Sequence, residues 1–171
     1  MAFGLIPRAT LEIPGGVRRL DRIRSLIESC SFSIHDLSRV QLDRTPPATP
    51  RFNMPFELGL TLGQTANATP QHTWFVFETR RWRLQKSLSD LNGIDPYVHE
   101  GRPQGVFREL RNAFVRQQAQ PTIEEMFGIY QGLRANVQKI LGDTGAKSLF
   151  EASVFKELTV YASALADQLV K

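Results

Sequence analysis

Two carboxylates, Asp36 and Glu57, are the residues whose neighbours best suit them to chemistry on a ligand. Residues 31–34 alternate and include β-formers, so they predict a buried strand whose carboxyl end delivers Asp36. Asn53 is a good helix N-cap and Pro55 is tolerated in a first turn, which predicts that Glu57 lies in the first turn of a helix. Unpaired N–H groups and the positive dipole end would hold Glu57 there as a carboxylate.

Polar residues on either side of these acids extend the candidate site. Ser38 and Arg39 follow the predicted strand, where they could contact hydroxyl groups or a phosphate of a ligand. Arg51 and Asn53 stand just before the predicted helix, where an anion would bind. Ser38 and Arg39 could equally stabilise the turn, and Asn53 could be a simple cap. The acids have a structural alternative as well, since Asp36 suits a turn and first-turn acids are common.

Arginine is concentrated in the first part of the sequence. Residues 1–120 hold 16 Lys and Arg against 11 Asp and Glu, whereas residues 121–171 hold 5 against 6. The excess is almost all Arg, which suits bidentate phosphate binding, although it could also be a solvated surface. Arg80, Arg81 and Arg83 follow a predicted strand and could clamp a phosphate, although three neighbouring Arg cannot all point the same way. The sequence lacks helix-turn-helix and zinc-finger patterns, so no nucleic-acid partner is expected.

We expect neither a metal nor a bound cofactor. His35, His72 and His99 lack the paired spacing of metal ligands, and no Gly-x-Gly-x-x-Gly or Walker-type loop occurs in the sequence. His35 could act as a base, but alternation along the strand turns it away from Asp36. A structural role is therefore favoured for His35.

The composition is that of an ordinary globular protein. The 171 residues are 42% hydrophobic and 22% charged, with a net charge of +4. No stretch approaches the roughly 20 apolar residues that cross a bilayer, so no membrane partner is expected. Cys30 is the only cysteine, which excludes an intramolecular disulfide, and the N-terminal residues do not resemble a signal peptide. A cytoplasmic protein is the expectation.

Alternating strands and helices predict an α/β fold with a parallel sheet and right-handed crossovers. We expect strands near residues 9–13, 31–36, 73–78 and 95–99, and helices near 19–28, 54–64, 82–91 and 104–117. Ligands of open α/β sheets bind at the carboxyl ends of the strands. Asp36 and Glu57 are therefore predicted to lie within about 10 Å of each other and to face one cavity.

The pattern changes after residue 120. Thr122 and Glu125 have the spacing of a capping box, and an amphipathic helix is predicted from there to the breaks at Gly142 and Gly145. A second amphipathic helix is predicted over residues 150–170. We therefore predict an α/β domain over residues 1–120 and a C-terminal α-helical hairpin over residues 121–171 that packs on the sheet or on a partner.

Three segments, SIHDLSR, RFNMPFELGLTLG and WRLQKSLSDLNGID, resemble bacterial proteins related to nucleoside 2-deoxyribosyltransferases and to Toll/interleukin-receptor (TIR) domains. The likeness spans roughly residues 4–116. It implies a three-layer, flavodoxin-like or Rossmann-like sheet that binds a nucleoside or nucleotide and cleaves or transfers its N-glycosidic bond. Glu57 matches the residue that attacks or stabilises the anomeric carbon, and Asp36 matches the orienting acid. NAD is a possible substrate.

The start of the sequence departs from this pattern. Relatives usually open with one more strand and helix before the segment that begins here at Gly4. That strand is central in a flavodoxin-like order, so we expect a sheet that lacks its usual first strand and has a seam that needs cover. A shortened site and a Pro-rich loop over residues 41–50 favour an alternative, a non-catalytic nucleotide-sensing or protein-interaction module.

The C-terminal helices carry more apolar side chains than one small sheet face needs. We therefore expect a homo-oligomer in which these helices bury against another copy, the alternative being that they cover their own sheet.

Overall fold

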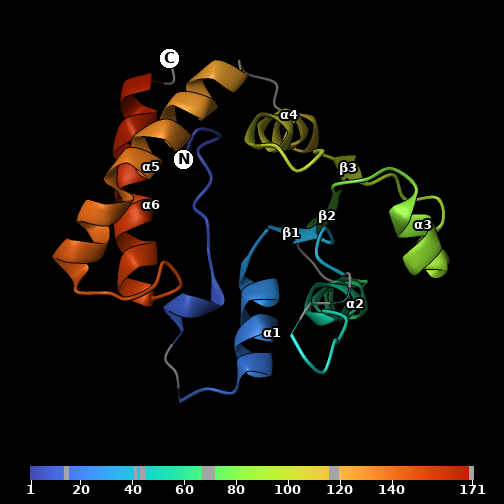
Figure 1. Cartoon of the computed structure of the whole chain (residues 1–171). Helices are drawn as coiled ribbons and strands as arrows, with labels where there is room; N and C mark the ends of the chain where they lie inside the picture. Colours follow the sequence, from blue (N-terminus) through green and yellow to red (C-terminus); the bar gives the residue numbers. More distant parts are fainter. Residues whose placement is uncertain (14–15, 41, 43–44, 67–71, 116–119, 170–171) are drawn as a thin grey trace. The chain divides into compact units, whose positions relative to one another are not determined.

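Three parallel strands organise residues 18–113. The computed structural model describes residues 1–13, 16–40, 42, 45–66, 72–115 and 120–169. The strands are β1 (Phe32–Asp36), β2 (Thr73–Glu78) and β3 (Tyr97–Val98), in the order β1-β2-β3 (Figure 1). Both pairings are parallel, with Phe32 opposite Thr73 and Phe77 opposite Tyr97. The predicted α/β class with a parallel sheet is therefore confirmed.

Helices alternate with these strands along the chain. They are α1 (Arg19–Ser29), α2 (Asn53–Thr65), α3 (Arg83–Ser87), the 3-10 helix η2 (Ser89–Leu91) and α4 (Pro103–Ala113). The predictions for α1 and α2 are correct to within one residue at each end. The helix predicted over residues 104–117 ends at Ala113, and residues 116 and 117 lie outside the described part.

The main core of this region lies on one face of the sheet. Its four fully buried members are Leu37, Leu58, Val76 and Leu84. Leu58 comes from α2 and Leu84 from α3, so both crossover helices pack on the same face, as right-handed crossovers between successive strands require. Aromatic rings pack on the other face, where the centroids of Phe77 and Tyr97 are 5.3 Å apart.

The expected seam at the centre of the sheet does not occur in the described strands. β1 pairs directly with β2 along its whole length, from Phe32 to Asp36. Backbone hydrogen bonds continue past both ends of the pairing, from Thr73 N–H to Ser31 O (3.0 Å) and from Leu37 N–H to Phe77 O (2.9 Å). The inner edge of β1 is therefore satisfied by β2 without an intervening strand.

The strand predicted over residues 9–13 is wrong. Residues Thr10–Glu12 form a 3-10 helix, η1. The Glu12 carboxylate accepts the N–H of Ala9 (2.5 Å) and pairs with Arg8 Nε (2.8 Å), so a local side-chain contact takes the backbone donor that a strand would need.

The single helix predicted over residues 82–91 is also wrong. Leu88 has the non-helical dihedrals φ −136° and ψ 69° and separates α3 from η2. Just before it, the Ser87 hydroxyl donates to the carbonyls of Arg83 (3.0 Å) and Leu84 (3.3 Å). The Ser87 hydroxyl thus competes with backbone N–H groups for the last carbonyls of α3, which favours the end of the helix at this point.

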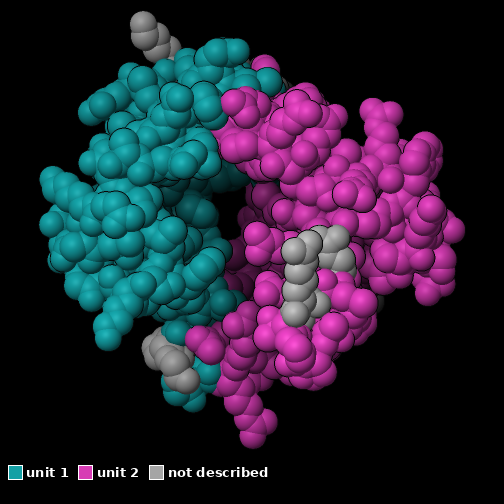
Figure 2. Space-filling view, viewed as in Figure 1, with its two compact units in different colours: residues 1–17, 114–171 teal, residues 18–113 magenta. Residues whose placement is uncertain are grey.

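The rest of the chain forms a second compact unit. Figure 2 colours residues 18–113 as unit 2 and residues 1–17 with 114–171 as unit 1. Residues 1–17 thus group with the C-terminal helices, whereas the predicted division placed them with the sheet. Met1 and Ala2 pack against the cluster of Ile129, Ala162 and Ala166, which explains this grouping.

Unit 1 is built on an antiparallel pair of helices, α5 (Ile123–Thr144) and α6 (Ala152–Leu169). The predicted capping box is confirmed, since Glu125 N–H donates to Thr122 Oγ1 (3.1 Å). Gly142 does not break α5, which ends at Thr144 and is followed by Gly145 as its C-cap, with φ +65°. Hydrogen bonding from Asn136 to the Tyr161 hydroxyl (2.9 Å) links the helices, so the predicted hairpin is present.

Gly105 gives a test of the packing of α4 on the end of β3. A Cβ atom at Gly105 would overlap the His99 carbonyl oxygen, whereas nothing lies within 4 Å of a Cβ at Gly59 in α2. We expect Gly105→Ala to lower the free energy of unfolding by at least about 2 kcal/mol, because backbone cannot move aside. Gly59→Ala should raise it by about 0.5–1 kcal/mol.

Urea denaturation of both variants measures these changes. A Gly105→Ala variant as stable as Gly59→Ala would contradict the close contact.

Candidate functional site

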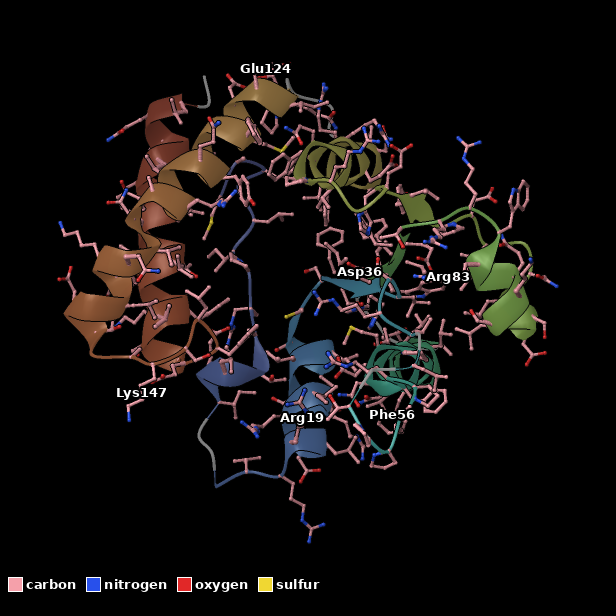
Figure 3. All side chains as sticks on the ribbon, viewed as in Figure 1. Arg19, Asp36, Phe56, Arg83, Glu124 and Lys147 are labelled. Atoms are coloured by element: carbon pink, nitrogen blue, oxygen red, sulfur yellow. The ribbon has the colours of Figure 1, made fainter. Side chains whose placement is uncertain are left out.

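Charged and polar side chains meet at the carboxyl ends of the three strands. β1 ends at Asp36, β2 ends at Glu78, and His99 directly follows β3. Because the strands are parallel, these ends share one edge of the sheet, the edge at which open α/β sheets bind ligands. Figure 3 labels Asp36 and Arg83 at this edge.

The Asp36 carboxylate is held by groups from two different strand ends. Its Oδ1 atom accepts hydrogen bonds from the N–H (2.9 Å) and the hydroxyl of Ser38. His99 Nε2 lies 3.0 Å from the same hydroxyl and 3.5 Å from Oδ1. All these contacts converge on Oδ1, while the Asp36 side chain is 50% exposed. The carboxylate is therefore oriented by the protein and still open to a ligand.

The tautomer of His99 follows from its other ring nitrogen. Gly101 N–H donates to His99 Nδ1 (3.2 Å), so Nδ1 is the unprotonated acceptor and Nε2 carries the proton. Nε2 then donates to Ser38, and Ser38 donates to Asp36. A nucleophilic serine needs the opposite order, in which the imidazole accepts the hydroxyl proton. This cluster positions Asp36 and does not activate Ser38.

His99 is a site residue that the sequence analysis missed. It is buried, and its N–H donates to the carbonyl of Glu78 (2.9 Å), which continues the pairing of β3 with β2. The turn behind it uses left-handed backbone at Glu100 (φ 58°) and Gly101 (φ 71°). The available signal was its position directly after a strand, which is the signal that identified Asp36.

An ion pair between the buried Glu78 carboxylate and the partly buried Arg83 guanidinium closes the end of β2. Arg83 donates to both carboxylate oxygens of Glu78, with a distance of 2.9 Å from Nε to Oε2. Its Nη2 also donates to the carbonyl of Leu37 (3.2 Å), directly after Asp36. Arg83 therefore joins the ends of β1 and β2. These contacts favour a structural role for Arg83 over the predicted role in phosphate binding.

Glu57 does not lie where the sequence analysis placed it. Helix α2 begins at Asn53, its N-cap is Phe52 without a side-chain hydrogen bond, and its first turn contains no acid. Glu57 is thus in the second turn, beyond the reach of the free N–H groups. Burial raises the pKa of its carboxyl above the usual value, and Arg19, with Nη2 at 3.9 Å, opposes that shift.

The structure thus brings together only some of the predicted site residues. Ser38 contacts Asp36 directly, whereas the described residues include none that pairs with both Asp36 and Glu57. Arg39, Arg51 and Asn53 are exposed, and Asn53 does not cap α2. The predicted separation of the two acids stays a prediction.

His35 lies on the opposite side of β1 from Asp36, as alternation predicts. It is 5% exposed, and its Nε2 lies 3.0 Å from the Ser33 hydroxyl, which is 2.9 Å from His72 Nε2. His72 Nδ1 donates to the Cys30 carbonyl (2.7 Å), so one hydroxyl bridges two imidazoles inside the fold. Burial and the neighbouring His72 lower the His35 pKa to about 4.

The described residues offer neither a metal cluster nor a membrane-spanning helix. No group of three or more His, Cys, Asp and Glu residues could hold a metal ion in the described ranges. Of the helices that the structure describes, none is both long and apolar enough to cross a bilayer.

Comparisons of this chain with protein-family models, with curated proteins and with solved structures find no match.

Acid should destabilise the protein in part through His35. Its pKa is about 4 in the folded chain against an ordinary value of 6.5, so below pH 6.5 the unfolded chain binds a proton that the folded chain does not. This contribution to stability is complete above pH 6.5 and is lost between pH 6.5 and 4, by up to about 3 kcal/mol. His35→Leu should show a shallower pH dependence in denaturant titrations. If the free energy of unfolding falls equally steeply as the pH is lowered in the wild-type protein and in His35→Leu, this prediction is wrong.

Removal of Arg83 should expose the importance of the ion pair. Arg83→Ala leaves the carboxylate of Glu78, which is 1% exposed, without its cation, so we expect a loss of about 3–5 kcal/mol in the free energy of unfolding. The control Arg80→Ala removes an exposed Arg three residues earlier and should change stability by less than about 0.5 kcal/mol. Thermal and urea unfolding measure both variants, and an equal loss of stability in Arg83→Ala and Arg80→Ala would refute the importance of the ion pair.

Proposed function

We propose that the protein binds a nucleoside or nucleotide at the carboxyl edge of its sheet and cleaves or transfers the ligand's N-glycosidic bond. The observation that carries this proposal is the Asp36 carboxylate, whose Oδ1 is held by Ser38 and His99 while half of the side chain remains exposed. NAD is one candidate substrate, and the protein needs no further cofactor.

The geometry at Asp36 suits a sugar. Carboxylates accept strong hydrogen bonds from hydroxyl groups, and two neighbouring ribose hydroxyls can share one carboxylate. Because Oδ1 already has protein donors, Oδ2 is oriented before the ligand arrives, which reduces the entropy lost on binding. Arg39, exposed three residues after Asp36, supplies a cation for a phosphate.

Glu57 is the proposed group for the bond-breaking step. In that step the C1′–N bond breaks, its electron pair leaves with the base, and the base takes a proton from water. The remaining hydroxide adds to C1′, which completes hydrolysis. In a transfer no water is consumed, because the incoming nucleobase adds to C1′ through its ring nitrogen and the proton it loses passes to the departing base. A partly buried carboxylate stabilises the positive charge that develops on the sugar. Support for this role comes from the resemblance of the FELG segment and from the partial burial of Glu57.

A non-catalytic nucleotide-sensing module is the second candidate. It is favoured by the different surroundings of the two acids, since Asp36 pairs with groups after β1 and β3 whereas Glu57 pairs with Arg19 of α1. A carboxylate with a cation already beside it is less able to stabilise a second positive charge.

We also propose a three-layer, flavodoxin-like arrangement, a cytoplasmic location and association through the C-terminal helices. The parallel sheet with crossover helices supports the first, and the single cysteine supports the second. Support for association comes from apolar side chains exposed on and before α6: Phe150 (81%), Val160 (58%) and Leu169 (40%).

Substitution of the two acids separates binding from catalysis. Asp36→Asn should weaken nucleotide binding about tenfold or more, because it removes a charged acceptor, and should also slow turnover. Glu57→Gln should leave binding within about twofold and abolish release of free base. Calorimetric titration measures binding, and chromatography of reactions with nucleosides, nucleotides and NAD measures base release.

Asp95→Asn is the matched control, since this exposed acid precedes β3 at the opposite edge of the sheet. Binding without base release by the wild-type protein would favour the sensing module. Unchanged binding by Asp36→Asn would refute the site itself.

A further inference from the structure

The turn after β2 is held by hydrogen bonds to the buried Glu78 carboxylate. The Glu78 carboxylate accepts the N–H of Thr79 and the Thr79 hydroxyl (3.1 Å) as well as the Arg83 guanidinium. Arg83 Nη2 also contacts Thr79 Oγ1 (3.2 Å). These contacts fix Thr79 and Arg83 at the two ends of the turn, so the positions of residues 80–82 between them are restricted.

Trp82 has a backbone conformation that its own packing does not explain. Its φ of 67° and ψ of −1° lie in the left-handed region, which is unfavourable for a bulky side chain. The side chain is 70% exposed, so the indole contributes little to the core. Backbone strain of this kind concentrates at ligand-binding sites, where the surrounding structure enforces it.

Two arginines precede Trp82 in the same turn. Arg80 and Arg81 are exposed, and neither forms an ion pair within the residues described. An aromatic face binds a nucleobase by stacking, and guanidinium groups bind phosphate oxygens. One exposed indole and two exposed guanidiniums within a single turn therefore suit a single phosphorylated nucleoside, whereas a nucleic-acid strand requires a repeated series of such groups.

The turn belongs to the same sheet edge as Asp36. Arg83 Nη2 donates to the carbonyl of Leu37, the residue that follows Asp36 (3.2 Å), and Figure 3 shows Asp36 and Arg83 at this edge. We propose, on the premise that this edge binds the proposed ligand, that residues 79–83 select nucleotides over nucleosides. Trp82 stacks on the base, and Arg80 and Arg81 bind the phosphate.

Titration of paired ligands tests the selection. We expect AMP, GMP, CMP and UMP as a group to bind the wild-type protein about tenfold or more tighter than the matching nucleosides. The Arg80→Ala/Arg81→Ala double variant should remove this preference without weakening nucleoside binding. Nucleotide should also quench the emission of Trp82, and Trp82→Phe identifies that signal because Trp74 is the only other tryptophan.

Two variants of Trp82 separate recognition from stability. Trp82→Gly suits left-handed backbone, so its melting temperature should rise by about 2–8 °C while nucleotide affinity falls about tenfold. Trp82→Phe should keep most of the affinity, since it keeps an aromatic face. Phe150→Ala and Arg24→Ala remove an exposed aromatic and an exposed cation elsewhere and should leave affinity unchanged.

The outcomes are distinct. If the wild-type protein binds neither nucleotides nor nucleosides, the proposed function fails and the selection fails with it. If both classes bind but Trp82→Gly keeps its affinity, or if nucleosides bind as tightly as nucleotides, only the role of the turn is overturned. Tighter binding of single-stranded RNA than of any mononucleotide would also overturn it, in favour of a nucleic-acid surface.

Discussion

The buried pair of Glu78 and Arg83 is the interaction on which the candidate site depends. Glu78 is at the end of the central strand, and its carboxylate accepts hydrogen bonds from the next turn as well as from Arg83. Arg83 reaches across to the carbonyl after Asp36. Burial of a carboxylate is unfavourable unless such partners are present. The pair therefore fixes the positions of the turn after β2, the start of α3 and the end of β1 relative to one another.

The site follows from this arrangement and from the pairing of β3. His99 N–H completes the pairing with β2, which places the imidazole beside Ser38 and Asp36. Gly105 permits α4 to approach the His99 carbonyl closely, and a side chain there would push the helix away. The orientation of Asp36 thus depends on contacts from the ends of β1 and β3 and on the pairing of β3 with β2, so it is a property of the folded unit.

Local pattern was enough to predict part of this architecture. The apolar run from Thr73 to Glu78 predicts β2, and the strand that ends at Asp36 predicts where that carboxylate lies. Both signals are local, because burial and alternation are visible along a few residues. The same holds for the capping box at Thr122, whose two partners are three residues apart.

Other features were decided by side-chain contacts that the alternation of apolar residues does not show. Residues 9–13 alternate like a strand, but Glu12 takes the Ala9 N–H. The environment of Glu57 is set by Arg19 on a different helix, and the role of His99 is set by Ser38, 61 positions away along the chain. The contacts of Glu57 and His99 join distant parts of the chain, so they become visible only when the chain is folded.

A crystal structure of the protein with a bound nucleotide tests the central claim most directly. We expect a ribose hydroxyl within about 3 Å of the free oxygen of Asp36, with Oδ1 still held by Ser38 and His99. A nucleotide bound away from the carboxyl ends of β1, β2 and β3, with Asp36 left in solvent, would contradict the account.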